Sequence, residues 1–407
     1  MTGPATPDGQ GVQSDERSGR AQWLVVVGVS LVSTSLAAYE IVPASVTPVI
    51  REQMGIGATA AGLLVGIMLG VAVLTSLPTG AILDRTDSRA AIVVAVLMLL
   101  GAGSWGWVAG TNGDYLQLLA SRVVGGVAYV VVWNAGIDIV SEAVDDRRRA
   151  TAVGAFTASG PVGFALGQSV GPVVATQLGW PAIFLAFDAL AVVGLALFWP
   201  VSNGLGRVGT ESPPTLAEFG DVFRDRGVLL VGALGFLGYS LYLFVNSWVP
   251  SYLTEEIGLS LTASGLLAAL FPAVGALSRT GGGVISDLLF DGRRRPVVVT
   301  SFVAATPFVV SFAVSRSVAV LVLALLGAGF AIQLTLGLSY AYVRELVSGR
   351  VAATAVAFQT TVGLGGAFLA PIAGGRLIDA AGYRAAFGVA VVLVVVGIAL
   401  AWLAPEP

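Results

Sequence analysis

The sequence predicts an all-α integral membrane protein with twelve transmembrane helices in two six-helix bundles that are related by an internal repeat. Hydrophobic residues make up 56% of the 407 residues, charged residues make up 11%, and the mean hydropathy is +0.87. A soluble globular domain carries roughly a quarter charged residues. Apolar stretches of about 20 residues recur along the chain, and a helix of that length crosses a hydrocarbon core of about 30 Å.

The repeat is clearest in polar and small residues, which coincide by chance less readily than apolar residues do in so hydrophobic a chain. The pairing holds at one offset, without a gap, over about 145 residues. One ancestral unit used twice explains such a pattern. At an offset of 203 residues the pairs include Tyr39 with Tyr242, Glu52 with Glu255, Gly80 with Gly283, Asp84 with Asp287, Gly126 with Gly329, Glu142 with Glu345 and Gly171 with Gly374.

Twelve apolar runs are the candidate spans, six in each repeat. They divide the chain into an N-terminal bundle over residues 23–200 and a C-terminal bundle over residues 227–404. The spans cover about residues 23–48, 58–83, 90–110, 115–140, 150–176, 180–200, 227–253, 261–287, 296–314, 318–343, 351–377 and 383–404.

Two polar segments lie outside the bundles. Residues 1–22 contain too few apolar side chains to offset the entropy of ordering, and we expect a disordered cytoplasmic tail. A signal peptide is the alternative for the run after Trp23, but Tyr39 has a repeat partner and so belongs to the folded unit. Residues 201–226, with Gly, Pro and mixed charges, form the longest polar interruption and are predicted to be a cytoplasmic linker.

The distribution of Arg predicts the orientation of the chain in the membrane. Fifteen of the 21 Arg fall in segments on the side of the N-terminus, four fall on the other side and two lie within spans. Basic residues concentrate in cytoplasmic loops. We therefore expect a multi-pass protein of a prokaryotic plasma membrane with both termini in the cytoplasm.

Composition also excludes several kinds of chemistry. All basic residues are Arg, and the chain has no Lys, His or Cys. Disulfides, thiol chemistry and His-based metal sites are therefore excluded, and a proton carrier inside the membrane has to be a carboxylate. The net charge of −3 does not favour a nucleic-acid partner. We expect no enzymatic activity, no cofactor and no metal.

A polar loop motif follows the second span and has a counterpart after the eighth. The first copy reads Gly80-x-x-x-Asp84-Arg85-x-Asp87-Ser88-Arg89. It is similar to the loop motif between the second and third helices of the major facilitator superfamily, with Asp87 where that family usually has Gly. The resemblance implies a cytoplasmic gate in which these loops lock one face shut. The predicted gate residues are Gly80, Asp84, Arg85 and Arg89 in the first half, and Gly283, Asp287 and Arg293 in the second.

Other segments resemble the same family over almost everything from Trp23 to Leu403. Arg122-Val-Val-Gly-Gly resembles its fourth-helix motif, which is built around an embedded Arg. The run from Gly163 to Pro172 resembles the fifth-helix motif associated with antiporters, although Ala158 replaces that motif's first Gly and the Gly pair after the Pro is missing. The entries to the last helix of each half, Leu178-Gly-Trp-Pro-Ala-Ile-Phe and Ala381-Gly-Tyr-Arg-Ala-Ala-Phe, also match. The resemblance implies a secondary transporter whose two bundles rock about a site at mid-membrane.

Charged residues within spans are costly and are therefore functional candidates. Glu40 lies on a polar face of small residues in the first span, and Arg122 shares a face with Tyr129 in the fourth. These helices are neighbours around the cavity in this family. Burial disfavours a charged carboxylate and a nearby Arg favours it, so the protonation of Glu40 can follow the opening of the cavity. Proton coupling and a static salt bridge both stay open, and Asp188 in the sixth span has no assigned role.

Arg279 in the eighth span is the candidate for binding an anion. The run from Arg279 to Asp287 resembles the eighth helix of anion-transporting branches, including nitrate carriers, but Ser76 occupies the place of their second Arg. Arg279 is well placed for a substrate carboxylate. The alternative is that it pairs with a loop carboxylate such as Asp287. Further predicted site residues share faces of the seventh and tenth spans, and they are Tyr239, Tyr242 and Asn246, and Gln333 and Tyr340.

The sequence thus favours a proton-coupled secondary transporter of a small organic or inorganic anion, working as a monomer with protons and the lipid bilayer as its other partners. No P-loop appears, so ATP does not drive it. One alternative is a proton-driven exporter of lipophilic compounds, which Glu40, Arg122 and the partial antiporter motif support. Another is a transporter-like sensor that binds its ligand without flux. Fold alone does not identify the substrate.

Overall fold

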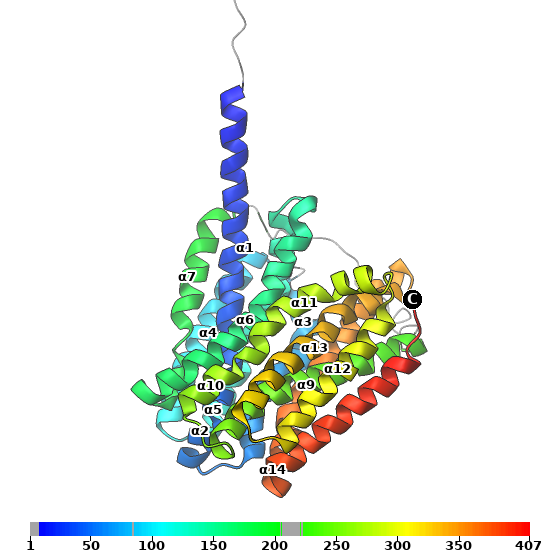
Figure 1. Cartoon of the computed structure of the whole chain (residues 1–407). Coiled ribbons are helices and arrows are strands. Elements are labelled where there is room, and N and C mark those ends of the chain that lie inside the picture. The colour runs from blue at the N-terminus through cyan, green and yellow to red at the C-terminus, as the bar shows by residue number, and fades with distance from the viewer. Residues whose placement is uncertain (1–7, 84, 204, 206–219, 221–222) are drawn as a thin grey trace, which may run out of the picture.

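The computed structural model describes residues 8–83, 85–203, 205, 220 and 223–407, and within these residues the regular structure is entirely helical (Figure 1). The predicted all-α fold is therefore confirmed. Two groups of helices lie side by side, one from each repeat. Residues 206–219 of the predicted linker lie outside the described residues.

The first half contains six spans. The sixth span is not one continuous helix. It begins as a 3-10 segment from Trp180 to Phe184, with Pro181 in its first turn, and an α-helix then starts at Asp188. A carboxylate at a helix N-terminus interacts favourably with the helix dipole, which gives Asp188 a structural explanation. The elements are α1 (Asp8–Ser45), α2 (Thr47–Met54), α3 (Ala58–Leu83), α4 (Ser88–Thr111), α5 (Tyr115–Ala143), α6 (Asp146–Leu178), η1 (Trp180–Phe184), α7 (Asp188–Phe198) and η2 (Trp199–Val201).

The second half repeats this arrangement with different interruptions. Its second span is divided at Ala269, and its last two spans run together as α14, with a left-handed residue at Gly382 (φ 77°). Glycine adopts this conformation without the clash that a Cβ causes. The elements are α9 (Arg226–Glu255), α10 (Leu261–Ala268), α11 (Leu270–Leu289), α12 (Arg294–Val314), α13 (Val318–Glu345), η3 (Gly349–Val351) and α14 (Ala352–Leu403).

These elements account for the twelve predicted spans. Ten stretches of the described chain are long and apolar enough to cross a membrane. One of them is α14, which supplies two spans on either side of Gly382, and the less apolar α6, with 33 residues, supplies the remaining one. An even number of spans brings both chain ends to one side, which we call the terminal face; the other side is the opposite face.

Polar residues placed immediately before the helices explain why several ends agree with the sequence prediction. A side-chain oxygen before the helix accepts a hydrogen bond from an N–H of its first turn, which otherwise has no partner. Residues that do this are Asp87 for α4, Asp114 for α5, Asp225 for α9 and Ser260 for α10. At the N-terminus α1 begins at Asp8, inside the segment for which the composition predicts a disordered tail, and residues 1–7 lie outside the described chain.

Each half has its own buried apolar cluster, and the halves meet closely near the opposite face. One cluster contains residues from the series of helices α1 to α7. The other contains residues from the series α9 to α14, together with a few residues of α1, α3 and α6. Glycines permit this contact: a Cβ on Gly62 would lie 2.2 Å from the carbonyl oxygen of Pro371, and one on Gly265 would lie 2.4 Å from that of Gln168. Small residues let membrane helices pack backbone to backbone.

Candidate functional site

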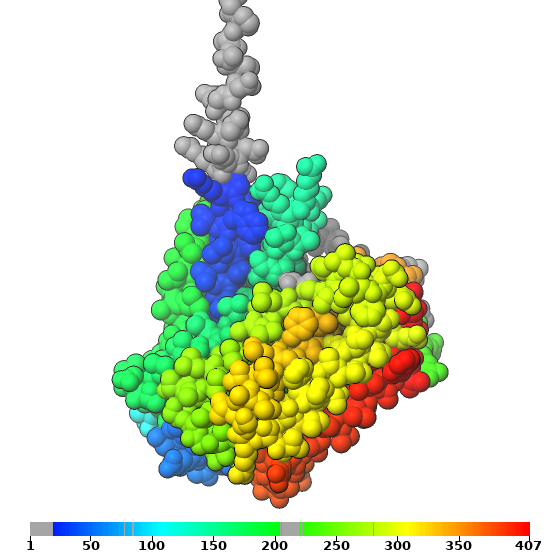
Figure 2. Space-filling view, viewed as in Figure 1, coloured from blue at the N-terminus to red at the C-terminus, as the bar shows by residue number. Residues whose placement is uncertain are grey.

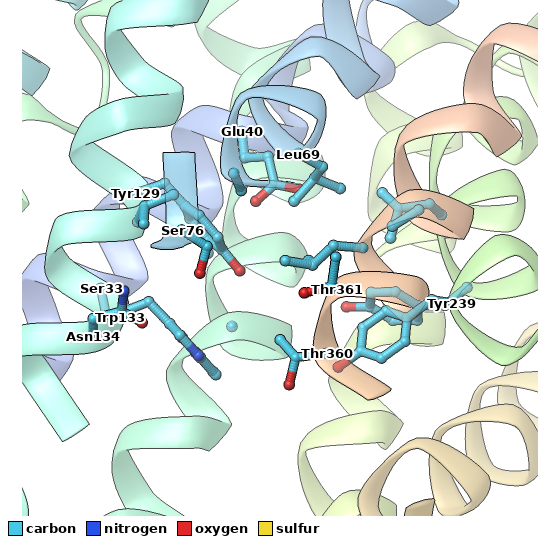
Figure 3. A pocket seen from close by; sticks show the side chains of 18 of the residues that line it. Ser33, Glu40, Leu69, Ser76, Tyr129, Trp133, Asn134, Tyr239, Thr360 and Thr361 are labelled. Atoms are coloured by element: carbon cyan, nitrogen blue, oxygen red, sulfur yellow. The ribbon is translucent and has the colours of Figure 1, made fainter. Parts of the chain in front are cut away.

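A cavity of about 300 Å³ lies between the two halves, about half way along the helices. Its walls come from α1, α3, α5 and α6 of the first half and from α9, α11, α13 and α14 of the second. Figure 3 shows polar and aromatic side chains from both halves pointing toward this common space. That this cavity is the transport site implied by the resemblance stays a prediction.

Ion pairs and hydrogen bonds close the opposite face. Nη1 of Arg51 lies 3.0 Å from Oε1 of Glu255, and the Tyr383 hydroxyl donates to the same carboxylate at 3.0 Å. Asp379 of α14 accepts three hydrogen bonds at the start of α3, from the main-chain N–H of Ala58 (2.7 Å), the N–H of Thr59 (2.8 Å) and the Thr59 hydroxyl (2.6 Å). Both contacts join the two halves, and neither was predicted from the sequence.

A second layer lies between this closure and the cavity. The rings of Phe164 and Tyr242, one from each half, stack with centroids 5.4 Å apart. The side-chain N–H of Gln168 donates to the side-chain oxygen of Asn246 at 2.9 Å and to its main-chain oxygen at 3.0 Å. Asn246, predicted as a site residue, thus lies outside the cavity lining and connects α9 to α6.

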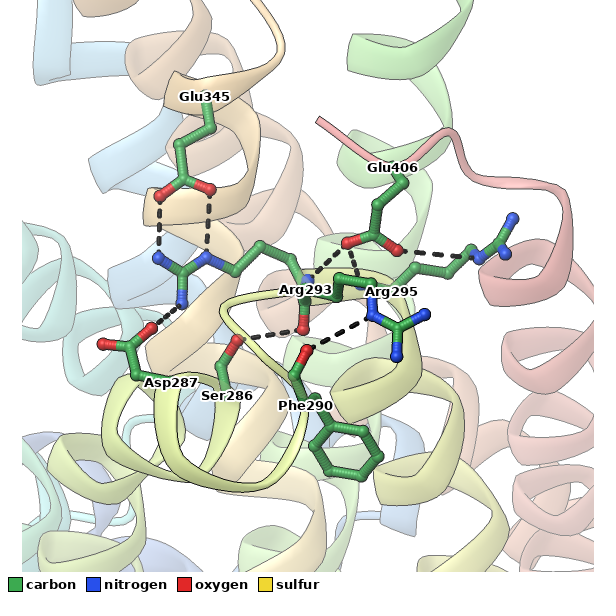
Figure 4. Close-up of polar contacts among 8 residues, drawn as sticks. Ser286, Asp287, Phe290, Arg293, Arg295, Glu345 and Glu406 are labelled. Carbon is green, nitrogen blue, oxygen red and sulfur yellow. Dashed lines mark hydrogen bonds and ion pairs between the residues drawn. The ribbon is translucent and has the colours of Figure 1, made fainter.

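The halves separate toward the terminal face, as Figure 2 shows. The polar contacts of the predicted gate residues stay within one half there. Nε of Arg89 donates to Ser202 at 2.9 Å, within the first half. In the second half Asp287 pairs with Arg294 at 3.0 Å, and Arg294 pairs with Glu345 at 2.9 Å (Figure 4).

The remaining predicted gate residues make fewer polar contacts in the described structure. Nε of Arg293 donates to the Phe290 carbonyl at 3.3 Å, so Arg294 and not Arg293 is the partner of Asp287. Arg85 is exposed, and a Cβ on Gly80 or Gly283 would have no neighbour within 4 Å. Asp84 lies outside the described residues. A gate that spans the two halves at this face therefore stays a prediction for another conformation.

Replacing Asp379 with Asn is expected to move the population toward a conformation that is open at the opposite face. An amide cannot accept all three hydrogen bonds, and lost charged hydrogen bonding of about 1 to 3 kcal/mol shifts such an equilibrium. The chain lacks Cys, so Ser264→Cys at the buried contact beside Gly265 and Thr361→Cys in the cavity report on the two sides. With a polar maleimide added to one side of the membrane at a time, Ser264→Cys should react faster from the opposite face and Thr361→Cys more slowly from the terminal face.

The matched control for this prediction is Asp146→Asn, which removes an ion pair with Arg149 that lies within α6. It should leave both labelling rates unchanged. Equal labelling in Asp379→Asn and in the unmodified background would show that this aspartate does not hold the opposite face shut.

Arg279 reaches the cavity from α11 with a neutral partner. Its Nε donates to Oε1 of Gln333 at 3.1 Å, and its guanidinium carbon lies 4.9 Å from the centre of the Tyr242 ring. Among the described residues, no carboxylate lies within 4.0 Å of it. The alternative pairing with Asp287 is absent because Asp287 binds Arg294. A half-buried guanidinium with no counter-ion is suited to a bound anion.

Glu40 lies in the cavity wall of the first half and is 2% exposed. Its Oε1 has no hydrogen-bond partner among the described residues. Arg122 does not pair with this carboxylate. Instead its guanidinium donates to the main-chain carbonyls of Leu64 (3.0 Å), Tyr39 (2.6 Å) and Glu40, and it lies 4.7 Å from the centre of the Tyr39 ring.

Arg122 is thus fully buried behind the wall, where it ties α1 and α3 to α5. Such carbonyl contacts satisfy a buried guanidinium without cancelling its charge. The static salt bridge considered for Glu40 and Arg122 is not formed in this conformation, and the carboxylate is left available to a proton.

Aromatic residues cover much of the remaining surface. The Tyr239 and Tyr340 hydroxyls lie 2.7 Å apart, and the Tyr129 and Trp133 rings stack with centroids 6.3 Å apart. Among the predicted site residues, those that line the cavity are Glu40, Tyr129, Tyr239, Tyr242, Arg279 and Tyr340, whereas Arg122, Asn246 and Gln333 lie behind its wall.

Several lining residues were not predicted. Asn134 follows Trp133 on α5, and Thr360 and Thr361 form a polar pair in the apolar sequence of α14. Adjacent polar residues in mid-span are the signal that could have identified the threonines. The Thr hydroxyls donate to carbonyls one turn earlier, at 2.9 Å each, so their lone pairs face the cavity as acceptors.

Comparisons with known proteins agree with this architecture. A probable L-galactonate transporter of Escherichia coli (strain K12) is 25% identical over 72% of this chain and 68% of its own length. A hexuronate transporter of Bacillus subtilis (strain 168) is 22% identical over 62% of each chain. A 3-(3-hydroxy-phenyl)propionate transporter of Escherichia coli (strain K12) is 27% identical over 61% of this chain and 58% of its own.

Among solved structures, a bacterial homologue of the human lysosomal transporter Spinster, in an inward-facing and unoccupied conformation, superposes with a TM-score of 0.79. It is 17% identical, and the match covers 94% of this chain and 97% of that one, a likeness that concerns the fold. The family model of the Major Facilitator Superfamily matches residues 25–366 and 245–407. The chain therefore belongs to the major facilitator superfamily and is a membrane transporter, not an enzyme.

Proposed function

We propose that this protein is a proton-coupled secondary transporter of a small organic anion, which it carries by alternating access. The single observation that carries the proposal is the guanidinium of Arg279, which reaches the cavity with a neutral glutamine as its side-chain hydrogen-bond partner. A guanidinium binds a carboxylate through two parallel hydrogen bonds, which makes a carboxylate its best-matched ligand.

The size and lining of the cavity narrow the class of substrate. A volume of about 300 Å³ suits a molecule of roughly one ring or one short carbon chain. Aromatic side chains offer flat apolar surfaces, and Asn134 and the two threonines offer polar atoms. The relatives named for galactonate, hexuronate and hydroxyphenylpropionate take acids of this size. Nitrate is less favoured because Ser76 lines the cavity where a second guanidinium would stand.

Glu40 is our proposed proton site. An ionised carboxylate with an unpartnered oxygen in a nearly dry wall is costly, so a proton stabilises it there. Opening of the cavity to water on one side or the other changes that cost. A proton and an anion bound in one cavity together compensate their charges, which favours movement of both in one direction.

We also propose the orientation of the chain. The excess of Arg in the loops of the terminal face is the positive-inside pattern, so that face is taken as cytoplasmic in a prokaryotic plasma membrane. The conformation described here is then open to the inside and closed to the outside. One chain builds the whole cavity, so a monomer is the proposed working unit.

A second candidate, a proton-driven exporter of lipophilic compounds, is favoured by one observation: Glu40, whose Oε1 has no hydrogen-bond partner among the described residues, faces a largely aromatic cavity. Both candidates are tested in proteoliposomes with an imposed pH gradient. We expect protein-dependent accumulation of an acid from a panel of galactonate, glucuronate and 3-(3-hydroxyphenyl)propionate, and its loss on addition of a protonophore. Movement of cationic dyes without movement of any acid would replace the first candidate with the second.

A further inference from the structure

We propose that Gln333 is a specificity-determining residue: its neutral amide holds the guanidinium of Arg279 toward the cavity without cancelling its charge, and so makes the site select anions. This inference rests on the proposed function and deepens it. It assigns to a residue behind the cavity wall the choice between a charged and an uncharged substrate.

The amide of Gln333 is fixed at both ends. Its Nε2 donates to the main-chain carbonyl of Phe271 at 3.0 Å, and its Oε1 accepts from Nε of Arg279 at 3.1 Å. The side chain is fully buried on α13. Because the carbonyl of Phe271 accepts only from the NH2 group, the oxygen of the amide has to face Arg279.

A glycine on the adjacent helix makes room for this amide. A Cβ on Gly275 of α11 would lie 1.6 Å from Nε2 and 1.9 Å from Oε1 of Gln333, so no larger residue fits there without moving the amide. The space is therefore built for the glutamine, one turn from Arg279 on the same helix. Three residues on two helices form one unit: a guanidinium, an amide that orients it and a gap that admits the amide.

The internal repeat shows that this unit belongs to the second half alone. At the offset of 203 residues, the positions of Gly275, Arg279 and Gln333 correspond to Ala72, Ser76 and Val130. All three of those residues line the same cavity and none of them is ionisable. The guanidinium and the amide therefore occur together in one half and are both missing from the other, as expected if the amide serves the guanidinium.

The direction of the hydrogen bond leaves the outer edge of the guanidinium free. Gln333 binds Nε of Arg279, and among the described residues no hydrogen bond engages Nη1 or Nη2, whose four N–H donors can bind a ligand carboxylate. A neutral acceptor preserves the positive charge, and a carboxylate in the same place would cancel it at close range. The charge of residue 333 thus sets the charge of the cavity wall.

The first test measures that charge without a substrate. Thr361→Cys places a single thiol in the cavity of this Cys-free chain, and its reaction rates are compared for an anionic and a cationic methanethiosulfonate. Adding Gln333→Glu should lower the ratio of anionic to cationic rate by about tenfold or more. Gln117→Glu is the control, because it adds the same charge at an exposed position near the start of α5, outside the cavity lining. It should leave the ratio unchanged.

The second test uses 3-(3-hydroxyphenyl)propionate and D-galactonate beside their primary amides, with dissociation constants measured by calorimetry. Gln333→Glu should weaken binding of the acid about a hundredfold and spare the amide. Gln333→Leu removes the orienting bond but keeps the charge, so it should retain the rate ratio and weaken the acid about tenfold, with the amide again spared. Gln333→Leu also keeps the binding test possible if the Gln333→Glu variant does not fold.

The two tests separate the inference from the proposed function. If the unsubstituted protein binds no acid but Gln333→Glu still lowers the rate ratio, the anion carrier proposal fails and the role of Gln333 in setting the cavity charge stands. An unchanged ratio in Gln333→Glu, or equal losses for acid and amide in Gln333→Leu, would overturn the inference, because a merely structural glutamine predicts that behaviour.

Discussion

Arg279→Ala is expected to abolish saturable binding of the transported anion, and Arg279→Lys to weaken it roughly tenfold or more. In the described cavity lining, the guanidinium of Arg279 is a positively charged hydrogen-bond donor that has no carboxylate partner. A lysine ammonium cannot reproduce its two parallel hydrogen bonds to a carboxylate. Binding is measured by calorimetry and by quenching of Trp133, which lies in the cavity wall.

Both variants should remain folded, because among the described contacts the loss of the guanidinium leaves the oxygen of Gln333 without its hydrogen-bond donor and removes the contact with the Tyr242 ring. Such a loss costs about 1 to 3 kcal/mol. Arg149→Ala is the control, since Arg149 pairs with Asp146 on α6, away from the cavity lining, and it should bind the anion as the unsubstituted protein does. Retained anion affinity in Arg279→Ala would refute the anion hypothesis and would favour the exporter of lipophilic compounds.

A double substitution separates this result from a role in the gate. If Arg279 paired with Asp287, combining Arg279→Ala with Asp287→Ala should recover much of what either single change loses. The structure assigns Asp287 to Arg294 instead. We therefore expect no recovery of anion binding in the double variant. Recovery would instead assign Arg279 to the gate.

Hydropathy and the repeat were sufficient to predict the spans, because in a bilayer every backbone group of a span has to be satisfied within its own helix. The prediction was less complete inside the spans, because an interruption within a span does not change its hydropathy. The division between α10 and α11 falls at Ala269, whose dihedral angles (φ −60°, ψ −21°) are close to helical. The signal is Pro272, which has no N–H to donate to the carbonyl of Ala268 and whose ring clashes with that carbonyl, so α10 ends there.

The side chains that line the cavity were partly predictable, because helical spacing places Tyr239 and Tyr242 on adjoining positions of one face, and Tyr242 has a repeat partner in Tyr39. Partners between elements were not predictable. Arg122 binds carbonyls of α1 and α3 rather than a carboxylate, and Asp379 caps a helix more than 300 residues earlier in the chain. Such contacts depend on how the bundles dock, and they belong to one conformation of the transporter.

Glu40→Gln is expected to abolish accumulation of substrate against its gradient while leaving substrate exchange at zero gradient largely intact. Glutamine resembles the protonated acid in shape and carries no titratable proton, so the variant should cycle with substrate bound but without proton movement. Glu40 is 2% exposed and its Oε1 has no partner in the part of the chain that the structure describes, so a neutral replacement fits this conformation without breaking a described ion pair.

The measurement compares two modes in the same proteoliposomes: uptake driven by an imposed pH difference, and exchange of labelled for unlabelled substrate at equal pH. Asp188→Asn is the matched control, since Asp188 begins α7 and is not part of the cavity lining, and it should retain both modes. Loss of both modes in Glu40→Gln would assign Glu40 to substrate binding rather than to coupling. Continued accumulation by Glu40→Gln in response to the pH difference would place the coupling carboxylate elsewhere.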